Sequence, residues 1–383
     1  MYSKKILFVI LALIPAILGA SPYFSPTWGF YMDLPEDYKY IDGDGVNRFS
    51  FGNPDGASLD IVAYAAGTAY QSVRELAADV QQRLNSSGDT DFFQYRNKEA
   101  AIIELVFTGP SDSGSIPMNG WGLALELGSD DPSKPGPFLI ALAYCPTQRQ
   151  DLQILNLSVL DSIAPTESDR LSPGPITEYG YPRETKVRYP VWGLGVDAWF
   201  YTEDEEASQA LIDREFNVFM RYADTPMWQD AWVRYYRAIY RDSCDRLADA
   251  AFSVERKFNS PDSDPAELAA SVLDWVQKFT YERNFQGSDF TNLVSAITDG
   301  RGDCDCRAML WALILNHANI RAAMMVSSVY SHAMGLADLP GTGARFDYLD
   351  TQWLVAETTA PVAPGLIAAD FSDMDNWIGI LLQ

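Results

Sequence analysis

The chain has 383 residues, which allows two domains of ordinary size, and 13% of them are aromatic, enough for two hydrophobic cores and too many for a disordered protein. Its formal net charge of −24 at pH 7 argues against strongly anionic partners, so we expect it to bind no nucleic acid and no anionic lipid. Four cysteines are too few for a disulfide scaffold of this size.

The first twenty residues have the layout of a secretory signal peptide. Two lysines precede an apolar run over residues 6–18, and Gly19-Ala20 offers small residues for cleavage before Ser21. Cleavage would remove two lysines and no acid, which changes the net charge from −24 to −26. We therefore expect a signal peptide at 1–20 and an exported protein, periplasmic or secreted, with no stable membrane insertion afterwards. The alternative is an uncleaved anchor, although the apolar run is short for a membrane span.

Residues 21–165 predict a first α+β domain. Apolar residues at helical spacing over 73–84 predict a helix, and a second helix is expected at 150–163. This order of strands, helix, more strands and closing helix indicates an antiparallel sheet with helices. With its opening Gly29-Phe30 and Leu34-Pro35, it resembles the PsbP-like family, and the resemblance implies a PsbP-like sandwich. The expected strands cover residues 29–35, 48–51, 59–64, 101–107, 121–127 and 138–144.

A stretch rich in proline, glycine and charge at residues 166–190 predicts an interdomain linker, and residues 191–383 predict a second domain. The aromatic side chains of an expected helix at 230–251 favour a core or domain-packing surface over a ligand site. Further elements are expected as a strand at 191–201, helices at 205–222 and 264–279, a short apolar segment at 293–297, and strands at 322–329, from 332 and at 352–357. The short connections between the last strands predict a mainly antiparallel sheet, packed on the helix described next.

A glycine-rich turn, Gly300-Arg301-Gly302-Asp303, delivers Cys304 to the first turn of a helix that is apolar on nearly every face, so this helix should be buried. A thiol there meets unpaired backbone N–H groups and the positive end of the helix dipole, and both favour the thiolate. His332 and Glu357 follow in the same segment. A nucleophile, a base and an orienting carboxylate together predict the catalytic triad of a thiol enzyme.

At these residues the chain resembles the transglutaminase-like superfamily of papain-type thiol folds, over roughly residues 264–359. Cys304 with Ala308, His332, and Trp353 followed by Glu357 match the superfamily's G-D-C-x-x-x-A turn, its strand histidine and its acid. The acid is Glu rather than the commoner Asp, and Ala333-Met334 replaces an aromatic-rich stretch. The first departure preserves the role of the acid, and the second makes the substrate groove harder to infer from the sequence.

The resemblance implies a reaction through an acyl-enzyme, either hydrolysis or amine transfer, on a peptide or protein substrate. If the protein is exported, this substrate lies in the cell envelope. We favour hydrolysis because transfer requires a water-poor acceptor channel. With only two histidines in the chain, no Cys/His cluster has zinc spacing, and we expect no metal and no cofactor. The competing interpretation is a catalytically inactive transglutaminase-like protein that serves as an envelope binding or assembly module. The oligomeric state stays open.

Several rival assignments stay open. Cys306 is the alternative nucleophile and Asp350 the alternative orienting acid. His317, at the far end of the helix, is better interpreted as a C-terminal cap. The backbone N–H of Cys304 is expected to stabilise an oxyanion, with Asn284 or Gln286 as candidate side-chain donors. A disulfide among Cys145, Cys244 and Cys306 is not decided by the sequence; a Cys244–Cys306 bridge is conceivable.

Overall fold

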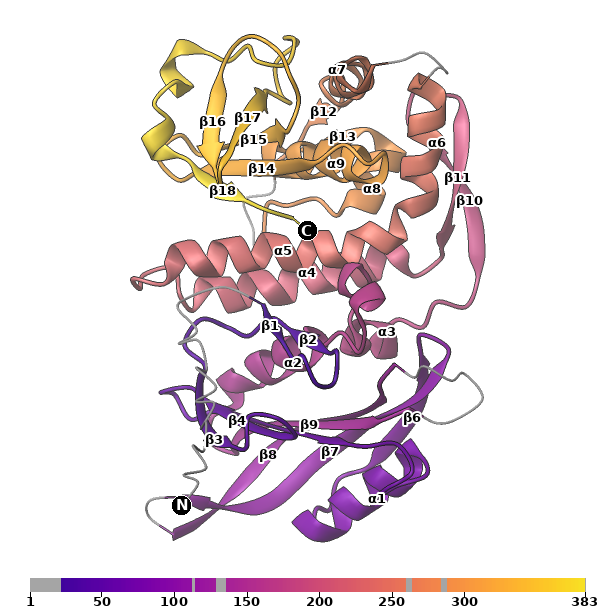
Figure 1. Ribbon diagram of the computed structural model, residues 1–383, viewed down its shortest axis with the longest axis vertical. Helices are drawn as coiled ribbons and strands as arrows, with labels where there is room; N and C mark the ends of the chain where they lie inside the picture. Colours follow the sequence, from indigo (N-terminus) through magenta and orange to yellow (C-terminus); the bar gives the residue numbers. More distant parts are fainter. Residues whose placement is uncertain (1–21, 112–113, 129–135, 260–263, 284–287, 383) are drawn as a thin grey trace, which may run out of the picture.

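The computed structural model describes residues 22–382 except 112–113, 129–135, 260–263 and 284–287. The predicted signal peptide, and Asn284 and Gln286, lie outside the described residues. Figure 1 shows one sheet at each end of the molecule, with the helices α4 (Asp204–Met220) and α5 (Trp228–Arg246) between them. In the described ranges, no helix is both long and apolar enough to cross a membrane.

The N-terminal half is built on an antiparallel sheet, whose described strands run in the order β3-β4-β5-β9-β8-β7-β6. Successive residues of a strand point to opposite faces of the sheet, so Ile102 and Ile103 belong to different cores. Helix α1 (Val73–Leu84) covers the face of Ile103, and α2 (Gln153–Asp161) covers the face of Ile102. The strands are β3 (Lys39–Gly43), β4 (Arg48–Gly52), β5 (Ser58–Tyr64), β6 (Thr90–Tyr95), β7 (Lys98–Ser111), β8 (Gly114–Glu126) and β9 (Phe138–Pro146). A small antiparallel pair, β1 (Tyr23–Phe24) and β2 (Tyr31–Met32), precedes them.

Helix α1 follows directly from its sequence. Ser72 accepts a hydrogen bond from the Glu75 N–H at the helix start, and Asn85 ends the helix in a left-handed conformation. The buried residues include Val73, Leu76 and Val80, which recur at helical spacing. The predicted helix over residues 73–84 is therefore confirmed.

The segment predicted as a linker, residues 166–190, is folded and packed. It contains a 3₁₀ helix, η2 (Glu167–Leu171), and helix α3 (Pro175–Gly180), and β10 (Lys186–Val191) begins inside it. Pro175 stands in the first turn of α3, and the buried Asp161 accepts hydrogen bonds from the N–H and the Oγ1 of Thr177, at 2.8 and 2.7 Å. In this segment Pro175 marks a helix start, and Gly174 marks a close packing contact, since a Cβ there would lie 2.1 Å from the Asp161 carbonyl oxygen.

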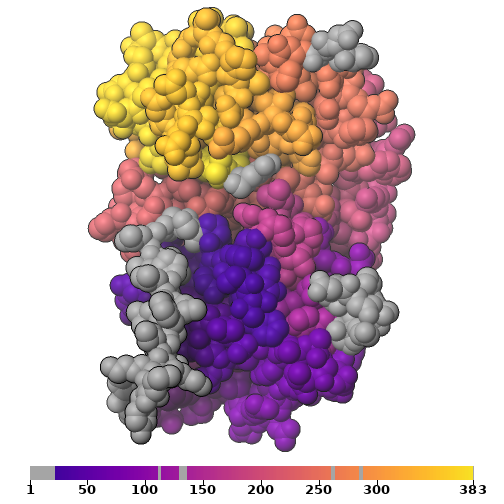
Figure 2. Space-filling view, viewed as in Figure 1, coloured from indigo at the N-terminus to yellow at the C-terminus, as the bar shows by residue number. Residues whose placement is uncertain are grey.

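The helical pair α4 and α5 is shared by both halves, which meet across it in Figures 1 and 2. Val218, Tyr222 and Ala231 belong to the core of the N-terminal sheet, whereas Ile239 and Tyr240 belong to the C-terminal core. The helix predicted at 230–251 is two helices, α5 and α6 (Ala248–Phe258), and the strand predicted at 191–201 is part of a hairpin of β10 and β11 (Val196–Tyr201).

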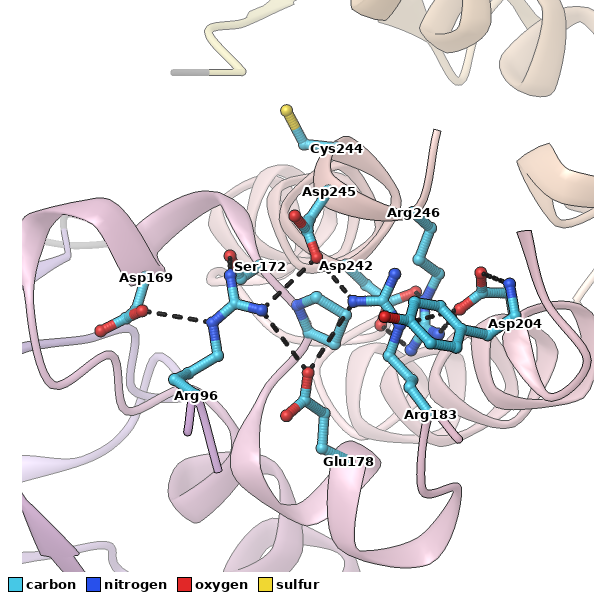
Figure 3. A network of polar contacts seen from close by, with 12 residues as sticks. Arg96, Asp169, Ser172, Glu178, Arg183, Asp204, Asp242, Cys244, Asp245 and Arg246 are labelled. Atoms are coloured by element: carbon cyan, nitrogen blue, oxygen red, sulfur yellow. Dashed lines mark hydrogen bonds and ion pairs between the residues drawn. The ribbon is translucent and has the colours of Figure 1, made fainter. Parts of the chain in front are cut away.

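Buried charges reinforce this junction (Figure 3). Arg246 donates to Asp204 at 2.6 Å and to both oxygens of Asp242, at 2.8 and 2.9 Å. Arg183 donates to Asp245 at 2.6 Å, and Arg96, from the turn between β6 and β7, also reaches Asp245 at 3.4 Å. The attraction within a desolvated ion pair compensates for the loss of hydration only if the two groups keep a well-defined geometry. This network therefore holds the N-terminal sheet in place against α4 and α5.

The C-terminal half has a second antiparallel sheet, in the order β16-β17-β15-β14-β18, and helix α9 (Cys304–His317) packs against it. Its strands are β14 (Ala322–Ser327), β15 (His332–Ala337), β16 (Arg345–Tyr348), β17 (Thr351–Ala356) and β18 (Ile378–Ile380). The remaining elements are η1 (Gln150–Leu152), α7 (Pro265–Val276), the parallel pair β12 (Thr280–Tyr281) and β13 (Arg301–Gly302), α8 (Leu293–Asp299), η3 (Ala369–Phe371) and η4 (Met374–Asn376). The predicted α+β class, with antiparallel sheets and a buried cysteine-bearing helix, is confirmed.

Candidate active site

Two glycines shape the turn that presents Cys304. Gly300 ends α8 at φ +66°, and a Cβ there would lie 2.1 Å from the ring of Trp192. Gly302 has φ +153°, and its Cβ would lie 2.6 Å from the sulfur of Cys306. The buried Arg307 donates to the Gly302 carbonyl at 3.0 Å and holds the turn from the other side. Only glycine fits either position without displacing the chain.

We expect Gly302→Ala to destabilise the protein by about 1–3 kcal/mol, because it combines an unfavourable φ with a collision against Cys306. Urea unfolding of the full chain measures this free energy. Gly180→Ala is the matched control, since its added Cβ would meet no atom within 4 Å. Equal stability of the two variants would show that the turn is not constrained as described.

Cys304 occupies the first position of α9, and its side chain is held among acids. Asp303 caps the helix by accepting a hydrogen bond from the Cys306 N–H at 2.9 Å. The thiol of Cys304, which is 5% exposed, donates to Asp305 Oδ1 at 3.3 Å. The other oxygen of Asp305 accepts from the Tyr236 hydroxyl at 2.5 Å. The residue therefore sits between two carboxylates at the helix start.

This environment changes the expected acidity of the thiol. Burial raises the pKa of Cys304, and the charges of Asp305 and Asp303 raise it further, whereas the backbone N–H of Ala333 acts in the opposite direction. Burial also raises the pKa of Asp305 and, together with the Asp305 charge, that of Asp303. The sequence-based expectation of a thiolate favoured by the helix N-terminus is thus opposed by the two flanking carboxylates.

The predicted base and acid are in direct contact. Antiparallel pairing of β15 with β17 brings His332 beside Glu357, and His332 Nε2 lies 2.8 Å from Glu357 Oε2. The other carboxylate oxygen accepts from the N–H and the Oγ1 of Thr359, at 2.7 and 2.6 Å. The imidazole ring also stacks on Phe371, with 5.0 Å between ring centroids. Both side chains are therefore held in fixed orientations.

The contact also keeps Glu357 ionised and selects the ring nitrogen of His332 that donates to it. Burial raises the pKa of Glu357, but the hydrogen bond and charge of His332 outweigh it, and the net pKa lies below the ordinary value. An ionised Glu357 can only accept, so His332 Nε2 carries the proton of this hydrogen bond. Nδ1 is then the ring nitrogen that can accept a proton from a thiol.

Cys304 and His332 line the same cleft, which has a volume of about 350 Å³. One part of its wall is aromatic and the rest is polar. The lining residues are Phe216, Phe219, Trp228, Trp232, Tyr235, Tyr236, Arg283, Asp289, Cys304, Asp305, Ser327, Ser328, Ser331 and His332. The two residues share the cleft wall, but the hydrogen-bond partner of the Cys304 thiol is Asp305 and not His332.

The rival residues lie elsewhere. Cys306 is fully buried against Gly302, and Asp350 is exposed at φ +57° in the turn between β16 and β17. His317 ends α9, and its Nε2 lies 3.0 Å from the Cys244 carbonyl oxygen, which ties this helix to α5. Cys145, Cys244, Cys304 and Cys306 are free thiols, so no bridge joins Cys244 to Cys306.

Three acids beside the sulfur were not singled out from the sequence. Asp289, Asp303 and Asp305 each place one carboxylate oxygen within 4.8 Å of the others, so these residues could hold a metal ion, although the sequence predicts none. Asp303 and Asp305 flank Cys304 in the chain, and that pattern could have been noticed. Asp289 comes from a distant loop, and only the fold brings it here.

Comparisons with known proteins identify no family for this chain. No protein-family model and no curated protein matches the chain. Among solved structures, a protein from Bacteroides thetaiotaomicron shares 12% identity over 58% of this chain and 78% of its own, with a TM-score of 0.28. Calcium-bound LapG from Legionella pneumophila shares 13% identity over 44% of this chain and 81% of its own, with a TM-score of 0.23. A protein from Cytophaga hutchinsonii that is described as a candidate cysteine protease shares 12% identity over 85% of this chain and 84% of its own, with a TM-score of 0.23. TM-scores this low carry no argument about the site or its reaction.

Proposed function

We propose that this protein is an exported thiol hydrolase that cleaves amide or peptide bonds through an acyl-enzyme. The observation that carries the proposal is the 2.8 Å contact between His332 Nε2 and Glu357 Oε2, in the wall of the cleft that Cys304 also lines. Export rests on the signal-peptide layout of residues 1–20. The substrate would be a peptide or protein of the cell envelope.

In the proposed reaction, His332 Nδ1 takes the thiol proton as the Cys304 sulfur attacks the carbonyl carbon, and Glu357 stabilises the imidazolium that forms. The tetrahedral intermediate collapses, and His332 returns the proton to the leaving amine, which leaves a thioester on Cys304. Water, deprotonated by His332, then releases the carboxylic acid and restores the thiol. The backbone N–H of Cys304, at the helix start, is the oxyanion donor that this geometry supports.

The raised pKa of the thiol agrees with this sequence of steps, because the proton moves to His332 during attack and no stored thiolate is required. The same observation also favours the second candidate, a catalytically inactive binding module. A thiol that donates to Asp305 at 3.3 Å and stays protonated could be purely structural. The reactivity of Cys304 therefore decides between the two.

We expect Asp305→Asn to speed alkylation of Cys304 by iodoacetamide at neutral pH. Removing the carboxylate removes a charge that opposes the thiolate, so the thiol pKa falls. The gain should be about threefold for each unit of that fall, because the thiolate fraction rises about tenfold while its nucleophilicity drops about threefold. Intact-mass kinetics measure the rate, and Asp350→Asn, at an exposed turn, should change nothing. A slower or unchanged rate in Asp305→Asn would overturn this view of the acids.

The proposed reaction is tested by incubating the full-length protein with peptide libraries, in the presence and absence of an amine acceptor, and identifying products by mass spectrometry. Hydrolysis products should appear, and Cys304→Ala should abolish them. Cys306→Ala is the matched control, because this buried thiol lies two residues away and outside the cleft lining. Turnover that survives in Cys304→Ala, or none in any condition, would reject the proposal.

A further inference from the structure

The aromatic face of α5 is divided between the core and the cleft. Trp228, Trp232 and Tyr236 recur every four residues and therefore lie in one row along the helix. Neighbouring rings in this row are 6.0 Å apart in both steps. The row ends at Tyr236, whose hydroxyl donates to Asp305, and Asp305 contacts Cys304. An aromatic wall thus leads directly to the candidate nucleophile.

Helix α4 completes this wall. Phe219 stacks on Trp232 at 6.4 Å and on Tyr235 at 6.1 Å, with interplanar angles of 20° and 28°. Phe216 packs against Phe219 at 6.3 Å. Because each ring is fixed by its neighbours, the wall is formed before any ligand arrives, and little conformational entropy would be lost on binding.

The outer rings of the wall are not ordinary core residues. Phe216, Phe219, Trp228 and Trp232 are all partly exposed, and all four line the cleft. The exposed parts of these four rings leave apolar surface in contact with water, which is unfavourable. Covering it with an apolar side chain would remove that cost.

We propose that Phe216, Phe219, Trp228 and Trp232 form the specificity subsite for an aromatic or large aliphatic side chain of a polypeptide substrate; this rests on the proposed hydrolase function. One cleft contains both this subsite and Cys304, so the recognised side chain belongs to the molecule whose carbonyl is attacked. The polar end of the cleft, with the ion pair of Arg283 and Asp289, is left for the peptide backbone and polar side chains.

The length of the row argues for a polypeptide over a small amide. Along α5, Trp232 lies about 6 Å and Trp228 about 12 Å from Tyr236, at 1.5 Å per residue. An extended peptide advances about 3.3 Å per residue. The apolar side chain should therefore stand roughly two to four residues from the bond that is cleaved, and a substrate shorter than this would leave the subsite empty.

Binding tests the subsite without turnover. Full-length Cys304→Ala is titrated by calorimetry with peptides that differ only in Phe, Leu or Ser at each position. We expect Phe and Leu peptides to bind roughly ten- to a hundredfold more tightly than Ser at one position, and Trp232→Ala or Trp228→Ala to remove this preference. Trp199→Ala is the matched control, since Trp199 is 43% exposed on β11 and does not line the cleft. Equal binding of all peptides, or the same loss in the Trp199 variant, would overturn the subsite.

Turnover separates this inference from the function on which it rests. In the otherwise wild-type chain, Trp232→Ala should lower kcat/KM for Phe and Leu peptides mainly through KM. Side-chain preference in binding without any turnover would reject the hydrolase and support the subsite. Turnover without side-chain preference, unaffected by Trp232→Ala, would reject the subsite and leave the hydrolase standing.

Discussion

Replacing His332 with alanine is expected to lower kcat/KM for peptide hydrolysis by about 10²–10⁴-fold, the usual contribution of a positioned general base. The reason is specific to this site. The Cys304 thiol is buried between two carboxylates that raise its pKa, so almost no thiolate exists at neutral pH without a base to take the proton. The measurement is steady-state hydrolysis of the best peptide from the library, with thermal unfolding to verify folding.

The chain supplies its own control for this prediction. His317→Ala removes the other histidine, which contacts the Cys244 carbonyl at the opposite end of α9. It should reduce stability without a comparable effect on kcat/KM. Glu357→Gln should cost less than His332→Ala, because the amide keeps a hydrogen bond but no longer stabilises the imidazolium. Comparable losses in the two histidine variants would mean that His332 acts through folding alone.

The second large effect concerns stability. Arg234 on α5 lies 2.9 Å from Glu215 Oε2 and 3.2 Å from Glu36 Oε1, and the three side chains are 2%, 3% and 1% exposed. Arg234→Ala would remove the ion-pair partner of the buried Glu36 and leave the buried Glu215 with Arg214 alone, and we expect it to destabilise the protein by about 3–5 kcal/mol. Arg74→Ala breaks an ion pair whose arginine is 59% exposed, and should cost no more than about 1 kcal/mol. Urea unfolding at pH 7 compares them.

The pH dependence of the stability lost in Arg234→Ala identifies the cause of that loss. Burial raises the pKa of Glu215, but Arg214 and Arg234 outweigh it, so the net pKa is low; burial keeps the pKa of Glu36 high despite Arg234. Without Arg234 both folded-state pKa values rise. The folded variant then binds more protons than its unfolded chain, so its stability increases as pH falls through this range. The deficit of Arg234→Ala should therefore shrink between pH 7 and pH 5, and a deficit that stays constant would point to lost packing instead.

Local patterns in the sequence predicted the elements that carry the candidate site. Periodicity identified α1, and the glycine turn followed by a continuous apolar run identified the helix at Cys304; strands were also predicted close to β14, β15 and β17. Several other strands were missed, among them β3, β6, β16 and β18. The last strand, β18, has three residues and gains its place only by pairing with β14. Nothing local in those residues favours a strand over a loop.

Properties that depend on packing could not be predicted in the same way. Asp303 and Asp305 were visible beside Cys304, but their effect on the thiol pKa follows from burial, which only the fold supplies. The sequence also predicts that residues 21–165 fold independently of the second domain, and this stays a prediction. Val218 and Tyr222 lie outside residues 21–165 but belong to the core of the N-terminal sheet. The thermal transition of the isolated fragment is therefore the direct test.

The most direct single measurement is competitive alkylation of the native full-length protein with limiting iodoacetamide, mapped by peptide mass spectrometry. Cys145 is the internal reference, because burial also raises its pKa and it lies in the sheet far along the chain. If Cys304 and His332 act as nucleophile and base, Cys304 should be labelled faster than Cys145, and His332→Ala should remove the difference. Labelling of Cys304 no faster than Cys145, or at a rate indifferent to His332→Ala, would contradict the proposed thiol chemistry.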